Sequence, residues 1–291
     1  MEILLAKDMG FCWGVRRAID IMEKAALERG QIASVGPIVH NPQVVKELEE
    51  KGVRMGLEPG QTDSLPVAIT AHGVGPEVLE EVRASGAEII DTTCPIVTRS
   101  QRWARKMAEA GFTVLVFGDP DHREVKGVMG WAGAKAMALT DGEPLPEALP
   151  AKIAVISQTT QSRERFAAFV SKLIQERLGE IGELRVVNTL CDVTSGQQAA
   201  ARELAQEVDL MLVVGGKNSA NTRHLLEACR EEGATAYHVE SATEMDPEWF
   251  RGCDRVGVTA GASTPDSAVE EVVERLRKIA RALGSPAGQK A

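Results

Sequence analysis

A pattern that repeats three times along the chain, each time starting at a cysteine, constrains the fold most. Cys12, Cys94 and Cys191 divide the 291 residues into near thirds. Each is followed by an amphipathic helical stretch (15–29, 99–110, 197–208), an apolar strand (32–35, 113–117, 210–214) and a glycine 24 residues after the cysteine (36, 118, 215). A glycine match alone carries little weight in a chain with 27 glycines. Its agreement with the helix and strand order predicts three copies of one α/β unit.

Each copy continues in the same way after its glycine. A second helical stretch follows (42–51, 124–132, 221–232), then a second strand (67–70, 153–156, 256–259) and a third helix. In two copies a β-branched strand then leads directly to the next cysteine (88–93, 185–190). The equivalent strand before Cys12 is 2–5, so we expect the first strand of the chain to complete the last unit.

Strands and helices that alternate at this length predict an α/β fold with small, mostly parallel sheets covered by helices on both faces. We expect three pseudo-threefold-related domains: residues 13–94, residues 95–191, and residues 192–283 completed by the N-terminal strand in 1–12. Residues 284–291 contain Gly, Ser and Pro, and we expect a flexible tail there. Ligands of such sheets bind beyond the carboxyl ends of the strands. Three units around one axis therefore bring the three thiols together.

The composition sets limits on the class of protein. Apolar residues make up 44% of the chain and charged residues 26%, which is typical of a folded globular protein. The net charge of −9 excludes a general affinity for nucleic acid or an anionic membrane. The sequence lacks a signal-peptide core and the roughly 20 apolar residues that cross a bilayer. We therefore expect a cytoplasmic protein with reduced cysteines.

Three converging thiolates fit two kinds of metal centre. One is zinc with a histidine as the fourth ligand, and the other is an iron–sulfur cluster with one iron that has no protein ligand. The alternative is that all three cysteines are buried for structural reasons, but their matched positions before three helices favour a shared site. Cys229 and Cys253 have no equivalents in the other copies, and we interpret them as packing residues.

Polar side chains gather at the strand-to-helix junctions. They are His40, His72, His122, Ser219, Asn221 and Ser263. Helix N-termini with such donors bind anions. At about 1.5–3 kcal/mol for each hydrogen bond to a charged partner, the set supplies on the order of 9–18 kcal/mol gross. This is enough, after the costs of association, for roughly micromolar binding. A diphosphate suits this inventory better than a carboxylate does.

Glu124 lies two residues after His122 and has two interpretations. It is either a solvated glutamate in the first turn of a helix, or an acid whose pKa rises beside a diphosphate in a water-poor site. Thr159 and Thr160 either relay its proton or cap a helix before Gln161. The sequence leaves both alternatives open.

Motifs in order along nearly the whole chain resemble one family, the 4-hydroxy-3-methylbut-2-enyl diphosphate reductases, which catalyse the last step of the methylerythritol phosphate route to isoprenoids. The motifs are GFCWGV (10–15), GPIVHNP (36–42), AHG (71–73), DTTCP (91–95), HREV (122–125), QTT (158–160), NTLC (188–191), GKNSAN (216–221) and TAGAS (259–263). Each is weak alone, and together they are highly specific.

The resemblance implies a trefoil of three α/β domains around one [4Fe-4S] cluster on Cys12, Cys94 and Cys191, with one open iron for the substrate hydroxyl. It implies that Glu124, Thr159 and His122 are catalytic. It also implies a set of substrate-binding residues: His40, His72, His122, Thr159, Ser219, Ala220, Asn221 and Ser263. Two electrons and two protons then remove the hydroxyl as water, giving isopentenyl or dimethylallyl diphosphate. A ferredoxin or flavodoxin is the implied electron donor, and Arg16, Arg17, Arg99 and Arg102 are candidates for its docking surface.

Two positions depart from the family pattern. Asp119 stands where many members have a second histidine, and Ala220 replaces a frequent serine, which puts local substrate affinity in doubt. Two other functions remain as alternatives: a quinolinate synthase, whose motifs do not match around Cys12 and Cys94, and a zinc-stabilised binding module for a phosphorylated metabolite.

Overall fold

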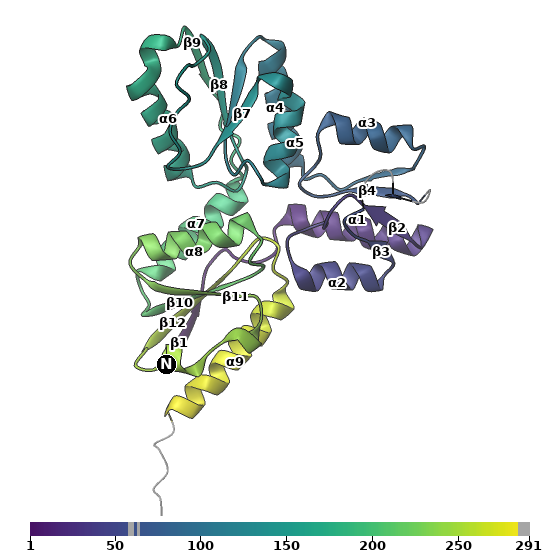
Figure 1. Cartoon of the computed structure of the whole chain (residues 1–291). Helices are drawn as coiled ribbons and strands as arrows, with labels where there is room; N and C mark the ends of the chain where they lie inside the picture. Colours follow the sequence, from purple (N-terminus) through teal and green to yellow (C-terminus); the bar gives the residue numbers. More distant parts are fainter. Residues whose placement is uncertain (58–60, 63–64, 285–291) are drawn as a thin grey trace, which may run out of the picture. The chain divides into compact units, whose positions relative to one another are not determined.

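Three four-stranded parallel sheets form the framework of the computed structural model, which describes residues 1–57, 61–62 and 65–284. Residues 285–291 of the predicted tail lie outside the described residues. The sheets share one strand order (Figure 1), which confirms the predicted α/β class with a threefold repeat. The strands, in spatial order, are β3 (Val53–Arg54), β2 (Ile32–Ser34), β4 (Val67–Ile69) and β5 (Ile89–Asp91); β7 (Ala136–Leu139), β6 (Thr113–Phe117), β8 (Lys152–Ser157) and β9 (Glu183–Val186); and β11 (Thr235–Val239), β10 (Leu210–Val214), β12 (Arg255–Ala260) and β1 (Glu2–Leu5).

The helices also follow one order in each copy. They are α1 (Trp13–Arg29), α2 (Pro42–Glu50) and α3 (Pro76–Ala84); α4 (Pro95–Glu109), α5 (Arg123–Ala132) and α6 (Arg163–Arg177); and α7 (Asp192–Ala205), α8 (Ala220–Glu231) and α9 (Asp266–Gly284). Short 3₁₀ helices are η2 (Gly133–Lys135), η3 (Leu178–Glu180), η4 (Ala242–Glu244) and η5 (Pro247–Phe250). Within the described ranges, no helix is both long and apolar enough to span a membrane.

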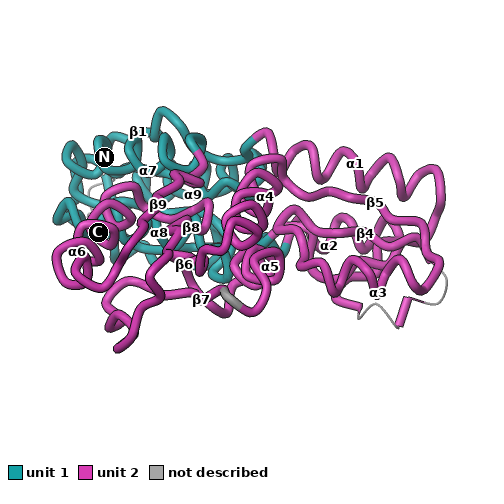
Figure 2. The backbone as a smooth tube through the Cα atoms, turned by 90° about the horizontal axis from the view of Figure 1, so that it is seen from above, with its two compact units in different colours: residues 1–12, 40–42, 192–291 teal, residues 13–39, 43–191 magenta. Residues whose placement is uncertain are grey.

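The chain forms two compact units, shown in different colours in Figure 2. Unit 1 comprises residues 1–12, 40–42 and 192–291, and contains the sheet of β1, β10, β11 and β12. Unit 2 comprises residues 13–39 and 43–191, and contains the other two sheets. The division into three domains at the predicted boundaries stays a prediction.

The sheet of unit 1 is covered on both faces. Every residue of β10 is buried, as expected for a central parallel strand. On one face α9 packs through Val272, Leu276 and Ile279, and on the other α7 and α8 pack through Leu204 and Leu225 (Figure 1). β1 pairs in parallel with β12, from Glu2 opposite Arg255 to Leu5 opposite Val258. This is the pairing that the repeat predicted for the first strand.

Unit 2 repeats the arrangement twice. β6 and β8 lie between α4 and α5 on one face and α6 on the other. The Phe117 ring of β6 packs on the α6 side against Phe166 and Phe169, with centroids 6.0 and 4.8 Å away. In the smaller sheet, Val82 of α3 packs on Ala33 and Val67, and Figure 1 shows α2 on the opposite side from α3.

The repeated glycines are explained by close approaches that leave no room for a Cβ atom. At Gly118 an added Cβ would lie 2.6 Å from the Cβ of Gln158, and at Gly215 it would lie 2.6 Å from the Thr264 hydroxyl. At Gly36 it would overlap the guanidinium of Arg123, which donates to the Val35 carbonyl. The register found in the sequence therefore marks the same tight turn after the first strand of each copy.

Two details of the predicted elements were wrong. The helices after the cysteines begin two, four and five residues earlier than expected, at Trp13, Pro95 and Asp192. Pro95 at the first position of α4 is a residue that commonly starts a helix. The fourth strand of each sheet was missed as well. β3 has two residues, and β7 has the sequence AMAL, which is a weak strand signal.

Threonine side chains join the last strand of each sheet in unit 2 to its neighbour. The Thr189 hydroxyl accepts from the Ser157 N–H at 2.8 Å and donates to the Ser157 carbonyl at 2.7 Å. Thr92 donates through both its N–H and its hydroxyl to the Ile69 carbonyl. Both threonines are fully buried, and each lies two residues before a cysteine.

We predict that Thr189→Val costs about 1–3 kcal/mol of unfolding free energy, because it leaves the buried Ser157 N–H without its acceptor. The matched control, Thr92→Val, should cost less, because the Ile69 carbonyl keeps the Thr92 N–H at 3.0 Å. Urea unfolding of both variants measures the difference. Equal losses would contradict the assignment of the Thr189 hydroxyl as the acceptor.

Candidate active site

The three repeated cysteines occupy one local geometry. Each lies directly before a helix, and its N–H donates to a carbonyl in the turn that follows β12, β4 or β8, the third strand listed above for its sheet. The bonds run from Cys12 to Ala262 at 3.0 Å, from Cys94 to Ala71 at 3.0 Å, and from Cys191 to Thr159 at 2.9 Å. The thiols are therefore held in the same way at the carboxyl ends of the three sheets.

These thiols fit a metal centre. All three are half-buried, and within the described residues the five cysteines form no disulfide. A helix N-terminus stabilises negative charge, which suits a thiolate ligand. Cys229 is different: it is fully buried in the core of unit 1, and burial raises the pKa of its thiol to about 12. Cys253 packs against the other core of that unit, so both behave as the packing residues that we expected.

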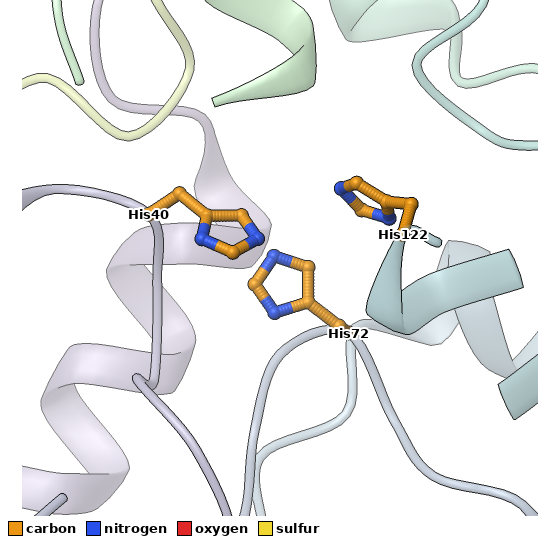
Figure 3. Close-up of side chains that lie close together, drawn as sticks. All are labelled: His40, His72 and His122. Carbon is orange, nitrogen blue, oxygen red and sulfur yellow. The ribbon is translucent and has the colours of Figure 1, made fainter. Parts of the chain in front are cut away.

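Two of the predicted histidines lie together in unit 2. His72 follows β4 and His122 directly precedes α5, and their rings meet edge to face with centroids 5.6 Å apart (Figure 3). The His122 Nδ1 accepts the Glu124 N–H at 3.2 Å. A neutral His122 therefore carries its proton on Nε2, where it can donate to a ligand. The third histidine in the figure, His40, belongs to unit 1.

Glu124 is a buried acid, with 2% of its surface exposed. The Thr159 N–H donates to Oε1 at 2.6 Å and the Thr159 hydroxyl donates to Oε2 at 2.9 Å. Burial raises the pKa of the carboxyl to about 7, although the two bonds from Thr159 act in the opposite direction. Of the two interpretations, the solvated surface glutamate is therefore wrong, and an acid that exchanges a proton near neutral pH is favoured.

The threonine pair has unequal roles. Thr159 holds Glu124, and its carbonyl accepts the Cys191 N–H, so it lies between the acid and a cysteine loop. The Thr160 hydroxyl accepts from the Gln158 side chain. Neither threonine caps the next helix, because Ser162 does so by accepting the Arg165 N–H.

Unit 1 carries the remaining candidates. Ser219 caps α8 by accepting the Thr222 N–H at 3.3 Å, and Ser263 donates to the His40 carbonyl at 3.2 Å. Asn221 is 4% exposed; its Nδ2 donates to Gln197 at 3.2 Å, while its Oδ1 has no hydrogen-bond partner among the described residues. A buried polar atom in this state suits a bound polar ligand.

The structure shows the local contacts and burial of the two residues that depart from the family pattern, Asp119 and Ala220. Asp119 accepts the Asp121 N–H at 2.9 Å, so its carboxylate stabilises the turn before α5. Ala220 is the buried first residue of α8, and its methyl side chain carries no hydrogen-bonding group.

Residues beyond the sequence prediction also touch the site. Gln197 bonds both Asn221 and the Gly10 carbonyl, and the Gln158 side-chain oxygen accepts the Asp119 N–H. Both glutamines are buried. Their amide side chains follow no motif or charge pattern, so only the packing of distant segments reveals them.

We predict that Glu124→Gln stabilises the protein at alkaline pH. The carboxyl ionises near pH 4.5 in the unfolded chain and near 7 in the folded protein, so the folded state loses stability as the pH rises from 4.5 through 7. The loss is at most about 3 kcal/mol above pH 7. The variant cannot ionise, so its advantage in urea unfolding should be absent at pH 4.5 and largest at pH 8.5. Glu109→Gln, an exposed residue of α4, is the control, and an advantage independent of pH would contradict the raised pKa.

Comparisons with known proteins identify one family. The family described as LytB protein matches residues 3–277. A 4-hydroxy-3-methylbut-2-enyl diphosphate reductase of Dehalococcoides mccartyi is 45% identical over 281 residues, covering 96% of this chain and 99% of the relative. The enzyme of the same name from an Anaeromyxobacter species is 45% identical over 283 residues, covering 97% and 99%.

Solved structures give the same result. A structure described as (E)-4-hydroxy-3-methyl-but-2-enyl diphosphate reductase, the terminal enzyme of the non-mevalonate pathway, matches with a TM-score of 0.67 at 37% identity, covering 96% of this chain and 100% of the other. The E-1-hydroxy-2-methyl-but-2-enyl-4-diphosphate reductase of Plasmodium falciparum matches with a TM-score of 0.85 at 25% identity, covering 94% and 87%. The chain therefore belongs to the LytB family of 4-hydroxy-3-methylbut-2-enyl diphosphate reductases.

Proposed function

We propose that this chain performs the reaction of its family at the three-cysteine site, with Glu124 as the proton donor. The substrate is (E)-4-hydroxy-3-methylbut-2-enyl diphosphate, and two electrons and two protons convert it to water and either isopentenyl or dimethylallyl diphosphate. The observation that carries the assignment of the site is the buried Glu124 carboxyl. Its partner Thr159 also accepts the Cys191 N–H, so the acid is two contacts away from a metal-ligand loop.

The metal centre in this proposal is a [4Fe-4S] cluster with three cysteine ligands, Cys12, Cys94 and Cys191. Their matched positions at helix N-termini and the hydrogen bond from each cysteine N–H support it. When bound, such a cluster supplies electrons one at a time and a Lewis-acidic iron without a protein ligand.

The diphosphate in this proposal is held by donors at helix N-termini. His122 precedes α5 and Ser219 precedes α8, and the positive end of each helix dipole also favours an anion there. His72 lies beside His122. The other residues proposed to bind the diphosphate are His40, Ala220, Asn221 and Ser263. Ala220 contributes through its backbone, since its side chain is a methyl group.

Protons reach the departing hydroxyl through Glu124 and Thr159. A carboxyl with a pKa of about 7 is protonated in a large fraction of molecules at neutral pH. In the structure the Thr159 hydroxyl donates to the carboxyl at 2.9 Å. When the carboxyl is protonated this bond can reverse, so that Thr159 accepts the proton of Glu124 and passes its own to the substrate oxygen, which leaves as water. The Thr159 N–H then stabilises the carboxylate that remains.

We predict that anaerobically prepared protein is brown, contains about four irons per chain and converts the allylic diphosphate to the two products with dithionite as reductant. Glu124→Gln should keep the iron and substrate binding but lose about 10²–10⁴-fold in turnover. Iron analysis, titration with substrate and product chromatography measure the three quantities.

Glu109→Gln is the matched control and should retain full turnover. A colourless protein that binds zinc would contradict the proposed centre and favour a zinc-stabilised binding module. Near-normal turnover of Glu124→Gln would remove its role as proton donor.

An acidic electron carrier, a ferredoxin or a flavodoxin, is the proposed partner. Arg102 and Lys106 of α4 line a groove with Trp103 and Pro95, which directly follows Cys94, and the Lys106 ammonium lies 4.6 Å from the centre of the Trp103 ring. Arg16, the fourth residue of α1, is exposed. Local positive charge on a chain of net charge −9 favours an acidic partner.

We predict that the double variant Arg102→Glu with Lys106→Glu slows reduction by the protein carrier and leaves reduction by dithionite unchanged, because only the carrier needs the charged surface. Stopped-flow reduction at low and high salt measures both rates. Lys24→Glu, an exposed residue of α1, is the control. Equal rates with the carrier before and after charge reversal would contradict docking on α4.

A further inference from the structure

Each helix that follows a repeated cysteine sends one side chain to the loop of the next cysteine. Arg17 of α1 donates to the Thr93 carbonyl at 3.3 Å, and Arg99 of α4 donates to the Leu190 carbonyl at 3.0 Å. Gln197 of α7 donates to the Gly10 carbonyl at 2.9 Å. The acceptors lie one residue before Cys94, one before Cys191 and two before Cys12, so the three contacts form a cyclic series.

The third contact is made by a different residue from the first two. Arg17 and Arg99 each lie five residues after a cysteine, and the residue in that position after Cys191 is Gly196, which has no side chain. Gln197, one position later, reaches the equivalent loop instead. The contact is therefore present in all three copies although a different residue makes it in the third. This indicates that the cysteine loop needs the contact, since a repeat of the sequence alone would have kept the same residue.

These donors complete the support of each cysteine backbone. The cysteine N–H is already bound to a turn carbonyl of its own sheet. The new contact holds the carbonyl of the same peptide at Cys94 and at Cys191, and the carbonyl of the preceding peptide at Cys12, so the backbone that leads into each thiol has a second fixed point. Residues that fix ligand orientation in this way control the affinity of metal sites.

Gln197 has a second contact, toward the proposed diphosphate site. It is 3% exposed, and its Oε1 accepts the Asn221 Nδ2 at 3.2 Å. One amide therefore bridges the loop before Cys12 and a proposed substrate-binding residue, with both ends inside unit 1.

We infer that Arg17, Arg99 and Gln197 are positioning residues for the three-thiolate centre, an inference that rests on the proposed function. Each of them fixes the local backbone of one cysteine loop. The two guanidinium groups also place positive charge next to the peptides preceding Cys94 and Cys191, where it stabilises the added electron of a reduced centre.

The test separates charge from geometry by comparing Arg99→Gln, Arg99→Lys and Gln197→Met, each prepared anaerobically with iron. We expect all three to release iron to a chelator at least fivefold faster than the parent. Arg99→Gln should also lower the midpoint potential, Arg99→Lys should restore it because the charge remains, and Gln197→Met should leave it unchanged because no charge is removed. Chelator kinetics and spectroelectrochemistry measure both quantities without turnover.

Arg105→Gln is the matched control, since Arg105 lies on α4 but pairs with Glu109 on the surface. Iron release within twofold of the parent for Arg99→Gln and Gln197→Met would overturn the inference while leaving the proposed function intact. A parent protein that binds no iron would instead contradict the proposed function. If Arg99→Gln fails to fold, Arg99→Lys and Gln197→Met decide the question.

Discussion

The burial of parallel strands on both faces is the constraint on which the rest of the structure depends. Strands such as β10 and β8 are buried along nearly their whole length, so their polar backbone groups are used within the sheets. Chemistry is then confined to the edge where the strands end and the helices begin. The repeated hydrogen bond from each cysteine N–H to a turn carbonyl is the direct result, because it joins the end of one strand to the start of a helix.

The same edge explains how a carboxyl can be kept away from water. Glu124 lies in the first turn of α5, where it would normally face solvent, but Thr159 of the neighbouring turn encloses it and supplies two donors. The balance between burial and these donors sets a pKa of about 7. If Glu124 were buried without the two donors of Thr159, its carboxyl would stay protonated at neutral pH. If Glu124 were exposed, its carboxyl would stay ionised. Proton exchange at neutral pH therefore needs both the burial and the hydrogen bonds from Thr159.

Much of this architecture was predictable from the sequence, because the helices, strands and glycines recur at the same distances after each of the three cysteines. Strand limits such as Thr113–Phe117 and Leu210–Val214 matched the apolar runs. Glu124 was found because it follows a histidine at a junction, although burial alone decided between its two interpretations. Gln197 was beyond prediction, because its two partners, Gly10 and Asn221, are distant in sequence and an amide carries no charge signal. Two of the strands that were not predicted, β3 and β7, are short or alanine-rich, and such segments gain their strand conformation from the sheet; β11, with the sequence TAYHV, has no such explanation.

The pairing of β1 with β12 sets the order in which the molecule can assemble during synthesis. Glu2 and its partner Arg255 are about 250 residues apart, which at 5–20 residues per second corresponds to roughly 13–50 s of translation. Until β12 leaves the ribosome, β1 has no strand to pair with in its sheet. Cys12 follows that strand by a few residues and bonds the Ala262 carbonyl, so it gains its native loop last, although it is the first of the three repeated cysteines to be made. Under the proposed function, the three-cysteine centre can therefore be completed only after the partner strand of β1 has been made.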